Sequence, residues 1–297
     1  MIDSAVLLID CPDQKGLVAR VSSLLYRHGA NILHADQHQD HELGLFFMRV
    51  EWALDRASND SATSATTGSK PYDLKAFEAE FAPLARELSM RWQLSSSARL
   101  PRVALFCSQY LHCMADLLYR WRAGELECEI PLIVSNHREV AELAAFYGIP
   151  FAHVPVTAAT RDQSERRQLE LLEHHEIELV VLARYMQILS PGFIARYPSA
   201  IINVHHSFLP AFTGAKPYHA AHERGVKLIG ATSHYVTEVL DDGPIIEQDV
   251  ARVSHRDQVE DLVARGRDLE RMVLSRAVRW HLDRRILCYG NKTVIFD

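Results

Sequence analysis

Beyond residue 102 the chain repeats a pattern that few folds can accommodate: short apolar runs alternate with longer segments of helical periodicity. Uninterrupted apolar runs are typical of parallel strands, because helices cover both faces of such a sheet. The alternation predicts an α/β, Rossmann-like, doubly wound sheet that binds ligands beyond the carboxyl ends of its strands. The expected strands are Val103–Cys107, Ile130–Ser135, Leu179–Ala183 and Ala200–His205, and the expected helices are His112–Arg122, Arg138–Tyr147 and Arg161–His175.

The end of the chain carries three further expected elements. Ile229–Val236 has the composition of another strand, and a long helix is expected over about Asp257–Asp283. A small hairpin over Ile286–Phe296 should follow, turned by Gly290 and Asn291.

The first ninety-four residues follow a different pattern. A helix is expected over Leu17–His28, where apolar residues recur at helical spacing and Gly29 ends the run. A second helix is expected over Asp73–Leu88. The expected strands are Ala5–Ile9, Ile32–His38, Leu43–Trp52 and Met90–Leu94. Strand, helix, strand, strand, helix, strand is the order of a ferredoxin-like α+β domain.

Two polar segments divide the chain. The Ser/Thr/Ala-rich tract Asp55–Ser69 has almost no apolar bulk, so we expect a mobile loop there. The segment 95–102 is polar and contains a proline just before the first apolar run. We therefore expect one domain over 1–94, a linker over 95–101 and a second domain over 102–297.

Composition excludes several classes of partner. The 297 residues are 48% hydrophobic and 24% charged, with a net charge of −6 and no basic block, so no nucleic-acid partner is expected. The apolar runs are too short to cross a bilayer, so no membrane partner is expected either. The five cysteines form no Cys-x-x-Cys pair, so we expect buried thiols in a reducing compartment. This favours a cytoplasmic protein.

Sixteen histidines are many for a chain of this size. His34, His38 and His41 have the spacing of a metal-binding helical face, but their surroundings predict strand and turn, which would scatter the three side chains. We therefore predict a solvated loop there and no metal site.

The strand Ala200–His205 carries the strongest candidate for chemistry. Asn203 and His205 are two residues apart, so both side chains point to one face where an open sheet places its substrate. A later loop holds Asp241 and Asp242 between two expected strands. An amide, an imidazole and a carboxylate favour acyl transfer, since the tetrahedral intermediate needs hydrogen-bond donors at its oxygen.

Asp241 can orient a protonated imidazole and take a proton from the attacking group, provided burial or a neighbour raises its pKa toward neutral. We expect direct attack by water or an amine without an acyl-enzyme. Ser207 is the rival candidate as nucleophile, although it lacks the glycine-flanked elbow of serine hydrolases.

The opening segment "LLIDCPDQKGLVARVSSLLYRHGANI" resembles the first strand, turn and helix of an ACT domain, a small regulatory module. The resemblance implies pairing of subunits and a small amino-acid effector, such as glycine or methionine, near Asp13 and Gly16. A purely structural dimerisation lobe is the alternative.

The motifs "INVHHSFLPAF" and "LDDGPII" resemble the signature of the folate-dependent formyltransferase family over about residues 102–297. This resemblance implies that Asn203, His205 and Asp241 are catalytic, with Asp242 in the variable place of the motif. It also implies a folate substrate and no separate cofactor.

Two features favour the branch of that family that hydrolyses 10-formyltetrahydrofolate to formate and tetrahydrofolate, balancing one-carbon pools and supplying formate for purine synthesis. The segment "VALFCSQYLHCMADLL" contains no glycine, so its backbone should not cradle a phosphate closely. The second feature is the combination of the ACT-like domain with the stretch "FTGAKPYHAAHERG", which resembles that branch. A formyltransferase with an unidentified amine acceptor and an inactive folate-binding regulator remain as alternatives.

By the same resemblance, "LARYMQILSPGF" should form the wall beside the pterin. Its backbone groups near residues 184–189 would recognise the pteridine ring, and Met186, Ile188 and Leu189 would pack on that ring. Lys216 could face the substrate's glutamate tail or a neighbouring subunit, and a homodimer or homotetramer is expected. The predicted substrate-binding residues are Arg184, Tyr185, Met186, Gln187, Ile188, Leu189, His234, Asp242 and Gly243.

Overall fold

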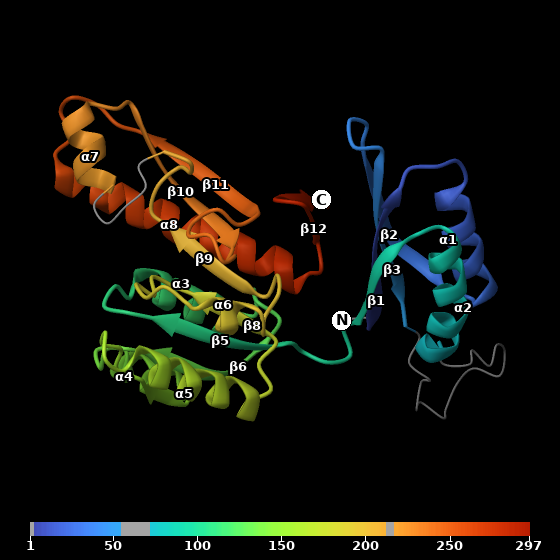
Figure 1. Ribbon diagram of the computed structural model, residues 1–297, viewed down its shortest axis with the longest axis horizontal. Coiled ribbons are helices and arrows are strands. Elements are labelled where there is room, and N and C mark those ends of the chain that lie inside the picture. The colour runs from blue at the N-terminus through green and yellow to red at the C-terminus, as the bar shows by residue number, and fades with distance from the viewer. Residues whose placement is uncertain (1–2, 55–71, 212–216) are drawn as a thin grey trace. The chain divides into compact units, whose positions relative to one another are not determined.

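The computed structural model describes residues 3–54, 72–211 and 217–297 and divides them into two compact units (Figure 1). The first unit comprises residues up to Arg99 together with Arg284–Leu287 and Val294–Asp297. The second comprises Leu100–Asp283 and Cys288–Thr293. The expected loop 55–69 and Lys216 lie outside the described residues.

The first unit is a four-stranded antiparallel sheet in the order β2-β3-β1-β4 with two helices on one face. This is the predicted ferredoxin-like α+β arrangement. Its elements are β1 (Ser4–Pro12), α1 (Leu17–Arg27), β2 (Asn31–Asp40), β3 (Leu45–Ala53), α2 (Leu74–Glu87) and β4 (Arg91–Ser96).

The core of this unit lies between the sheet and the two helices. Val21 and Leu25 of α1 and Phe77 and Phe81 of α2 are fully buried against the strands. Gly29 ends α1 with a φ of 75°, a backbone conformation that glycine adopts without the steric cost of a side chain. Helical spacing of the apolar residues therefore predicted the bounds of both helices to within one or two residues.

The second unit is a seven-stranded sheet in the order β11-β10-β9-β8-β5-β6-β7. The five strands from β5 to β9 pair in parallel, as the apolar runs predicted, whereas β10 and β11 pair antiparallel at one edge. The strands are β5 (Arg102–Cys107), β6 (Glu129–Ser135), β7 (Phe151–His153), β8 (Leu179–Leu182), β9 (Ile201–His205), β10 (Leu228–Tyr235) and β11 (Ile245–Arg252).

Helices cover both faces of this sheet. The helices α5 and α6 pack on one face, where Leu172 and Phe193 join the strand residues in one buried cluster. The long helix α8 packs against β9, β10, β11 and the helices α3 and α7. The helices are α3 (His112–Arg122), α4 (Ala141–Tyr147), α5 (Arg161–His174), α6 (Pro191–Ile194), α7 (Pro217–Arg224) and α8 (Val259–Leu282).

The chain ends in the predicted hairpin, formed by β12 (Ile286–Tyr289) and β13 (Lys292–Ile295). The outer ends of its two strands belong to the first unit, where Nε of Arg49 donates to the carbonyl of Arg284 at 3.0 Å. Its turn groups with the second unit, where Asn291 Nδ2 donates to the carbonyl of Asp242 at 2.7 Å.

Candidate active site

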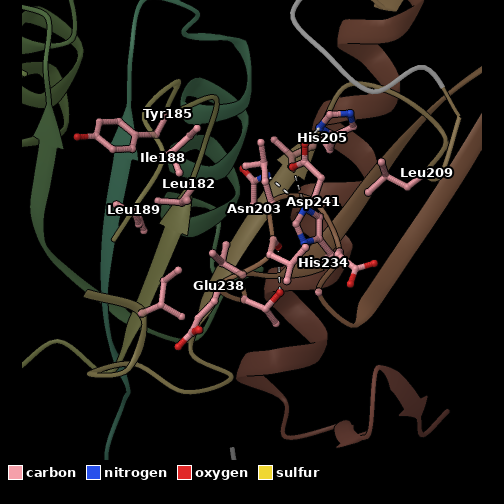
Figure 2. Close-up of a pocket in the computed structure, with 18 of the residues that line it drawn as sticks. Leu182, Tyr185, Ile188, Leu189, Asn203, His205, Leu209, His234, Glu238 and Asp241 are labelled. Carbon is pink, nitrogen blue, oxygen red and sulfur yellow. Dashed lines mark hydrogen bonds and ion pairs between the residues drawn. The ribbon is translucent and has the colours of Figure 1, made fainter. Parts of the chain in front are cut away.

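The antiparallel pairing of β9 and β10 brings an amide and two imidazoles together. Asn203 and His205 lie on one face of β9, and the strand register places His234 of β10 directly opposite Asn203. The Nδ2 atom of Asn203 lies 3.3 Å from Nε2 of His234. Figure 2 shows these side chains at the mouth of the same cavity. The predicted pair on β9 thus gains a third partner from the neighbouring strand.

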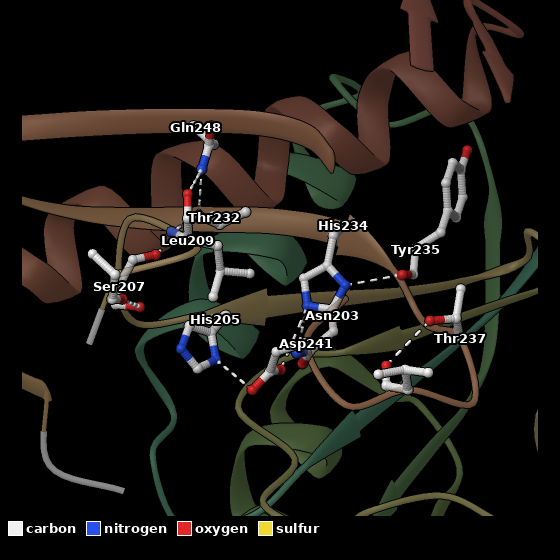
Figure 3. Close-up of polar contacts among 12 residues, drawn as sticks. Asn203, His205, Ser207, Leu209, Thr232, His234, Tyr235, Thr237, Asp241 and Gln248 are labelled. Atoms are coloured by element: carbon white, nitrogen blue, oxygen red, sulfur yellow. Dashed lines mark hydrogen bonds and ion pairs between the residues drawn. The ribbon is translucent and has the colours of Figure 1, made fainter. Parts of the chain in front are cut away.

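Asp241 lies between the two imidazoles (Figure 3). Its Oδ2 is 3.2 Å from Nδ1 of His205, and its Oδ1 is 3.7 Å from Nε2 of His234. Asp241 has a φ of 55°, the left-handed region that most side chains avoid, so the loop is shaped to present this carboxylate.

Hydrogen bonding sets the tautomer of His234. Its Nδ1 lies 2.9 Å from the carbonyl of Tyr235, which can only accept, so Nδ1 carries the proton. The remaining nitrogen, Nε2, faces the Asn203 amide and the Asp241 carboxylate. In a neutral ring Nε2 can accept from Nδ2 of Asn203, and in a doubly protonated ring it can donate toward Asp241 instead.

The electrostatics of Asp241 differ from the sequence-based expectation. Hydrogen bonds from His205 and then His234 hold the pKa of Asp241 well below its usual range, although partial burial opposes this shift. The base role of Asp241 was made conditional on burial or a neighbour raising this pKa toward neutral, and the resting site does not meet that condition. The neighbours that form the site are the cause, because each imidazole stabilises the charged form.

The far side of the His205 ring is free to meet a reactant. Its Nε2 is buried and has no hydrogen-bond partner among the described residues, while Nδ1 faces Asp241. The rival nucleophile Ser207 is placed differently: its Oγ donates to the carbonyl of Ala211 at 2.7 Å. The arrangement can therefore polarise a carbonyl with Asn203 and His205, next to a carboxylate that is ionised in the resting site.

A cavity of about 960 Å³ opens beside these groups. All twelve residues predicted to be catalytic or substrate-binding line it, and they come from segments 184–189, 203–205, 234 and 241–243. Its volume is at the upper end of the range for small-molecule sites, about 300–1,000 Å³. The structure therefore gathers these residues around one site large enough for a folate.

The segment 184–189, which we call the wall loop, forms one side of the cavity. The apolar side chains of Met186 and Ile188 are 49% and 58% exposed and are available to a ring. Leu189 is buried in the core, and the phenol of Tyr185 turns away from the cavity and accepts from Gln168 Nε2 at 2.8 Å (Figure 2). The guanidinium of Arg184 faces the buried Glu270.

Sequence reasoning missed part of the lining. Residues 236–240 between β10 and Asp241 line the cavity, and Val239 and Leu240 are 63% and 62% exposed. Asn291 of the terminal hairpin and the segment around Leu209 also contribute. The signal available in the sequence was the pair of apolar residues Val239 and Leu240, directly before the two aspartates.

One group of possible metal ligands occurs within the parts of the chain that the structure describes: His112, Cys113 and Glu270. Burial raises the pKa of the Cys113 thiol well above its usual value, which opposes the thiolate that a metal would need. Glu270 already contacts His112, Tyr218 and Arg184. These residues do not fit a metal site. The solvated loop predicted for the three N-terminal histidines was wrong for two of them: His34 and His38 lie in the strand β2, and only His41 follows it, although all three are exposed.

The predicted effector residues lie at the turn between β1 and α1. Asp13 accepts from Nε2 of Gln39 at 3.1 Å, and its amide donates to the carbonyl of Gly44 at 2.8 Å. Gly16 directly precedes α1 with a φ of 90°. Both residues are exposed.

Known proteins resemble both parts of the chain. Residues 101–278 match the family model described as formyl transferase, and residues 5–51 match that of the ACT domain. The chain is 53% identical over 295 residues to the formyltetrahydrofolate deformylase of Synechocystis sp., covering 99% of this chain and 98% of that protein.

Solved structures show the same relationship. The crystal structure of a formyltetrahydrofolate deformylase from Pseudomonas syringae pv. tomato aligns with a TM-score of 0.93 at 48% identity, covering 100% of this chain and 95% of that one. Glycinamide ribonucleotide transformylase 1 from Symbiobacterium toebii aligns with a TM-score of 0.64 at 29% identity, covering 69% of this chain and 98% of that one. The first similarity spans both units, and the second spans part of the chain.

Proposed function

This chain belongs to the formyltetrahydrofolate deformylase family, and on that premise we propose that it hydrolyses 10-formyltetrahydrofolate through Asn203, His205 and Asp241. The products are formate, which can supply purine synthesis, and tetrahydrofolate. The observation that supports the catalytic assignment is that all three side chains meet in one cavity, with the buried Nε2 of His205 unoccupied by any described residue.

The first step is attack of water on the formyl carbon. The new C–O bond forms as the carbonyl π bond breaks, and the electron pair moves to the formyl oxygen. Asn203 Nδ2 and a protonated Nε2 of His205 donate to that oxygen, a contribution worth about 10²- to 10³-fold per donor. The proton that the water loses passes to the Asp241 carboxylate.

The low pKa of Asp241 makes it a weak base while His205 remains protonated. Since the hydrogen bond from His205 is the largest cause of that low pKa, the pKa rises as the imidazole gives up its proton to the intermediate. Proton uptake by Asp241 and proton release by His205 are therefore coupled.

The second step is collapse of the intermediate. The carbonyl bond reforms as one hydroxyl proton of the intermediate returns to His205, the bond between carbon and N10 breaks, and N10 takes the proton held by Asp241 to give tetrahydrofolate and formic acid. Formic acid then loses its proton to solvent. Water and the formyl amide thus account for every atom of the two products, and no redox step occurs.

The test is an assay of formate released by the purified protein from 10-formyltetrahydrofolate with no amine acceptor present. Formate at a rate proportional to enzyme concentration supports hydrolysis. Formate release only after an amine is added would favour the formyltransferase alternative. Folate binding without turnover would favour an inactive regulator.

We further propose that the hydrolysis needs no metal. The poor fit of His112, Cys113 and Glu270 as ligands supports this. Activity should survive dialysis against a strong chelator, and a loss that added divalent metal restores would reject the proposal.

Within the described residues, no helix is long and apolar enough to span a membrane, and we propose a cytoplasmic location.

For the ACT domain we propose a small amino-acid effector, glycine or methionine, at the turn that holds Asp13 and Gly16. The match to the ACT family and the exposure of this turn support an effector site. Calorimetry should show binding of one of the two amino acids, and Asp13→Ala should weaken it. Absence of both binding and any change in rate would leave the domain a structural lobe.

We propose a homodimer or homotetramer. The edge strand β2 is exposed along most of its ten residues, which leaves its outer backbone groups open to pairing with another chain. Sedimentation velocity at several protein concentrations tests the oligomer, and a monomer at all of them would reject it.

We keep 1–94, 95–101 and 102–297 as the proposed domain limits, with the outer ends of the hairpin strands grouped with the first unit.

A further inference from the structure

The wall loop begins in a backbone conformation that needs external support. Arg184 has a φ of 64°, the left-handed region in which a side chain meets the backbone. Such a residue persists only where surrounding contacts hold it. The loop therefore depends on neighbours for the shape of the cavity wall.

Ser108 supplies contacts on both sides of that residue. It follows β5 directly, and its amide donates to the carbonyl of Arg184 at 3.1 Å. Its hydroxyl oxygen accepts from the amide of Met186 at 3.0 Å. The backbone amide and the hydroxyl of Ser108 thus join the end of β5 to two peptide groups of the wall loop, and only the bond to Met186 involves the side chain.

The direction of these hydrogen bonds is fixed by chemistry. The Met186 amide can only donate, so the Ser108 hydroxyl accepts from it and sends its own proton elsewhere. That proton goes to Oδ1 of Asn136, 2.7 Å away, just beyond β6. Ser108 is 3% exposed, so water competes little for these bonds.

The side chain of Arg184 is anchored on the opposite side. Its Nε lies 3.3 Å from Oε2 of Glu270, and its guanidinium lies over the ring of Tyr110 at 5.3 Å. Glu270 is 1% exposed and also accepts from the hydroxyl of Tyr218 at 2.6 Å. The side chain of Arg184 therefore forms an ion pair with Glu270, without a hydrogen bond from Nε, and its backbone carbonyl accepts from the Ser108 amide.

We propose that Ser108 is a positioning residue for folate binding: its hydroxyl holds the peptide group of Met186, next to the Arg184 carbonyl that its backbone amide holds, so that the wall loop is preformed before substrate arrives. The proposal rests on the proposed function, in which this loop binds the pterin. Ser108 acts through the loop and touches no reacting atom. Its loss should therefore weaken substrate binding and leave the chemical step nearly unchanged.

The test compares Ser108→Ala with the control Ser275→Ala in the full-length protein. Ser275 is also buried, but its hydroxyl donates only within α8, to the carbonyl of Met272. For Ser108→Ala we expect KM for 10-formyltetrahydrofolate to rise about tenfold with kcat within about twofold of wild type. Ser108→Thr keeps the hydroxyl and should restore most of the affinity.

Hydrogen exchange of the ligand-free protein separates this proposal from the proposed function. Peptides that cover residues 184–189 should exchange faster in Ser108→Ala and at the wild-type rate in Ser275→Ala. Unchanged exchange would overturn the positioning role, whatever the kinetics show. Faster exchange with an unchanged KM and folate affinity would overturn the link to folate binding. A wild-type protein that releases no formate would reject the proposed function and leave the exchange result intact.

Discussion

Oδ2 of Asp241 lies 3.2 Å from Nδ1 of His205, on the side of the ring opposite the unpartnered Nε2. The carboxylate can therefore stabilise a protonated imidazole while Nε2 points its proton at a substrate oxygen. The same contact keeps Asp241 ionised in the resting enzyme. One pair of residues thus links the oxyanion donor to the proton acceptor.

Replacing Asp241 by Asn should lower kcat by about 10²- to 10⁴-fold, because the amide neither accepts the proton of the attacking water nor stabilises the imidazolium. Folate affinity should change little, since the ring binds at the wall loop. Steady-state formate release and equilibrium folate binding check the two parts. The control is Asp162→Asn, which changes an exposed carboxylate in the first turn of α5. An Asp241→Asn variant with near wild-type kcat would remove Asp241 from the mechanism.

The ionised state of Asp241 predicts how stability depends on pH. A carboxyl whose pKa is lower in the folded chain stabilises the fold above its unfolded pKa, and this contribution is lost as pH falls toward the folded value. The difference in unfolding free energy between wild type and Asp241→Asn should therefore be constant between about pH 6 and 5 and should narrow below about pH 4.

Urea unfolding of both proteins at several pH values measures this difference. The Asp162→Asn variant again controls for the loss of one negative charge. A difference in unfolding free energy that stays constant down to about pH 2 would mean that Asp241 keeps its ordinary pKa in the folded chain, against the contacts with His205 and His234.

Asn203 is expected to act in the transition state. Asn203→Ala should lower kcat by about 10²- to 10³-fold with a small change in KM, because the amide donates to charge that develops during attack. Asn203→Asp should be at least as slow, since it places a second carboxylate beside Asp241 and removes the donor. Equal activity of Asn203→Ala and wild type, measured under the same conditions, would contradict the assignment.

The main architecture was confirmed because its signals are local. Uninterrupted apolar runs marked β5, β6, β8 and β9, and helical spacing marked α1, α3 and α5. The antiparallel direction of β10 and β11 was not predicted, because the composition of a single strand does not determine the direction in which it pairs with its neighbour. The short β7 and α7 were missed because three and eight residues give little periodicity.

The candidate site, like the fold, was predictable where the signal lies within one strand and not where it depends on contacts between strands. Asn203 and His205 were predictable because alternation along one strand fixes their common face. The direct pairing of Asn203 with His234 depends on the register between two strands, which the spacing of residues does not determine. The direction of the Asp241 pKa was missed for this reason, since it depends on how closely two histidines from different strands approach the carboxylate.

Gly243 should be essential for the position of Asp241. A Cβ atom at residue 243 would lie 1.7 Å from the carbonyl oxygen of Tyr235, the same oxygen that accepts from His234 Nδ1. Because that oxygen belongs to the backbone, Gly243→Ala must displace the aspartate loop, β10 or both. We expect kcat to fall by about 10²-fold or more and the melting temperature to fall by about 3 to 10 °C. The matched control is Gly192→Ala in α6, whose Cβ would meet its nearest atom at 3.9 Å. Wild-type activity and melting temperature in Gly243→Ala would show that the loop can move away without disturbing the site.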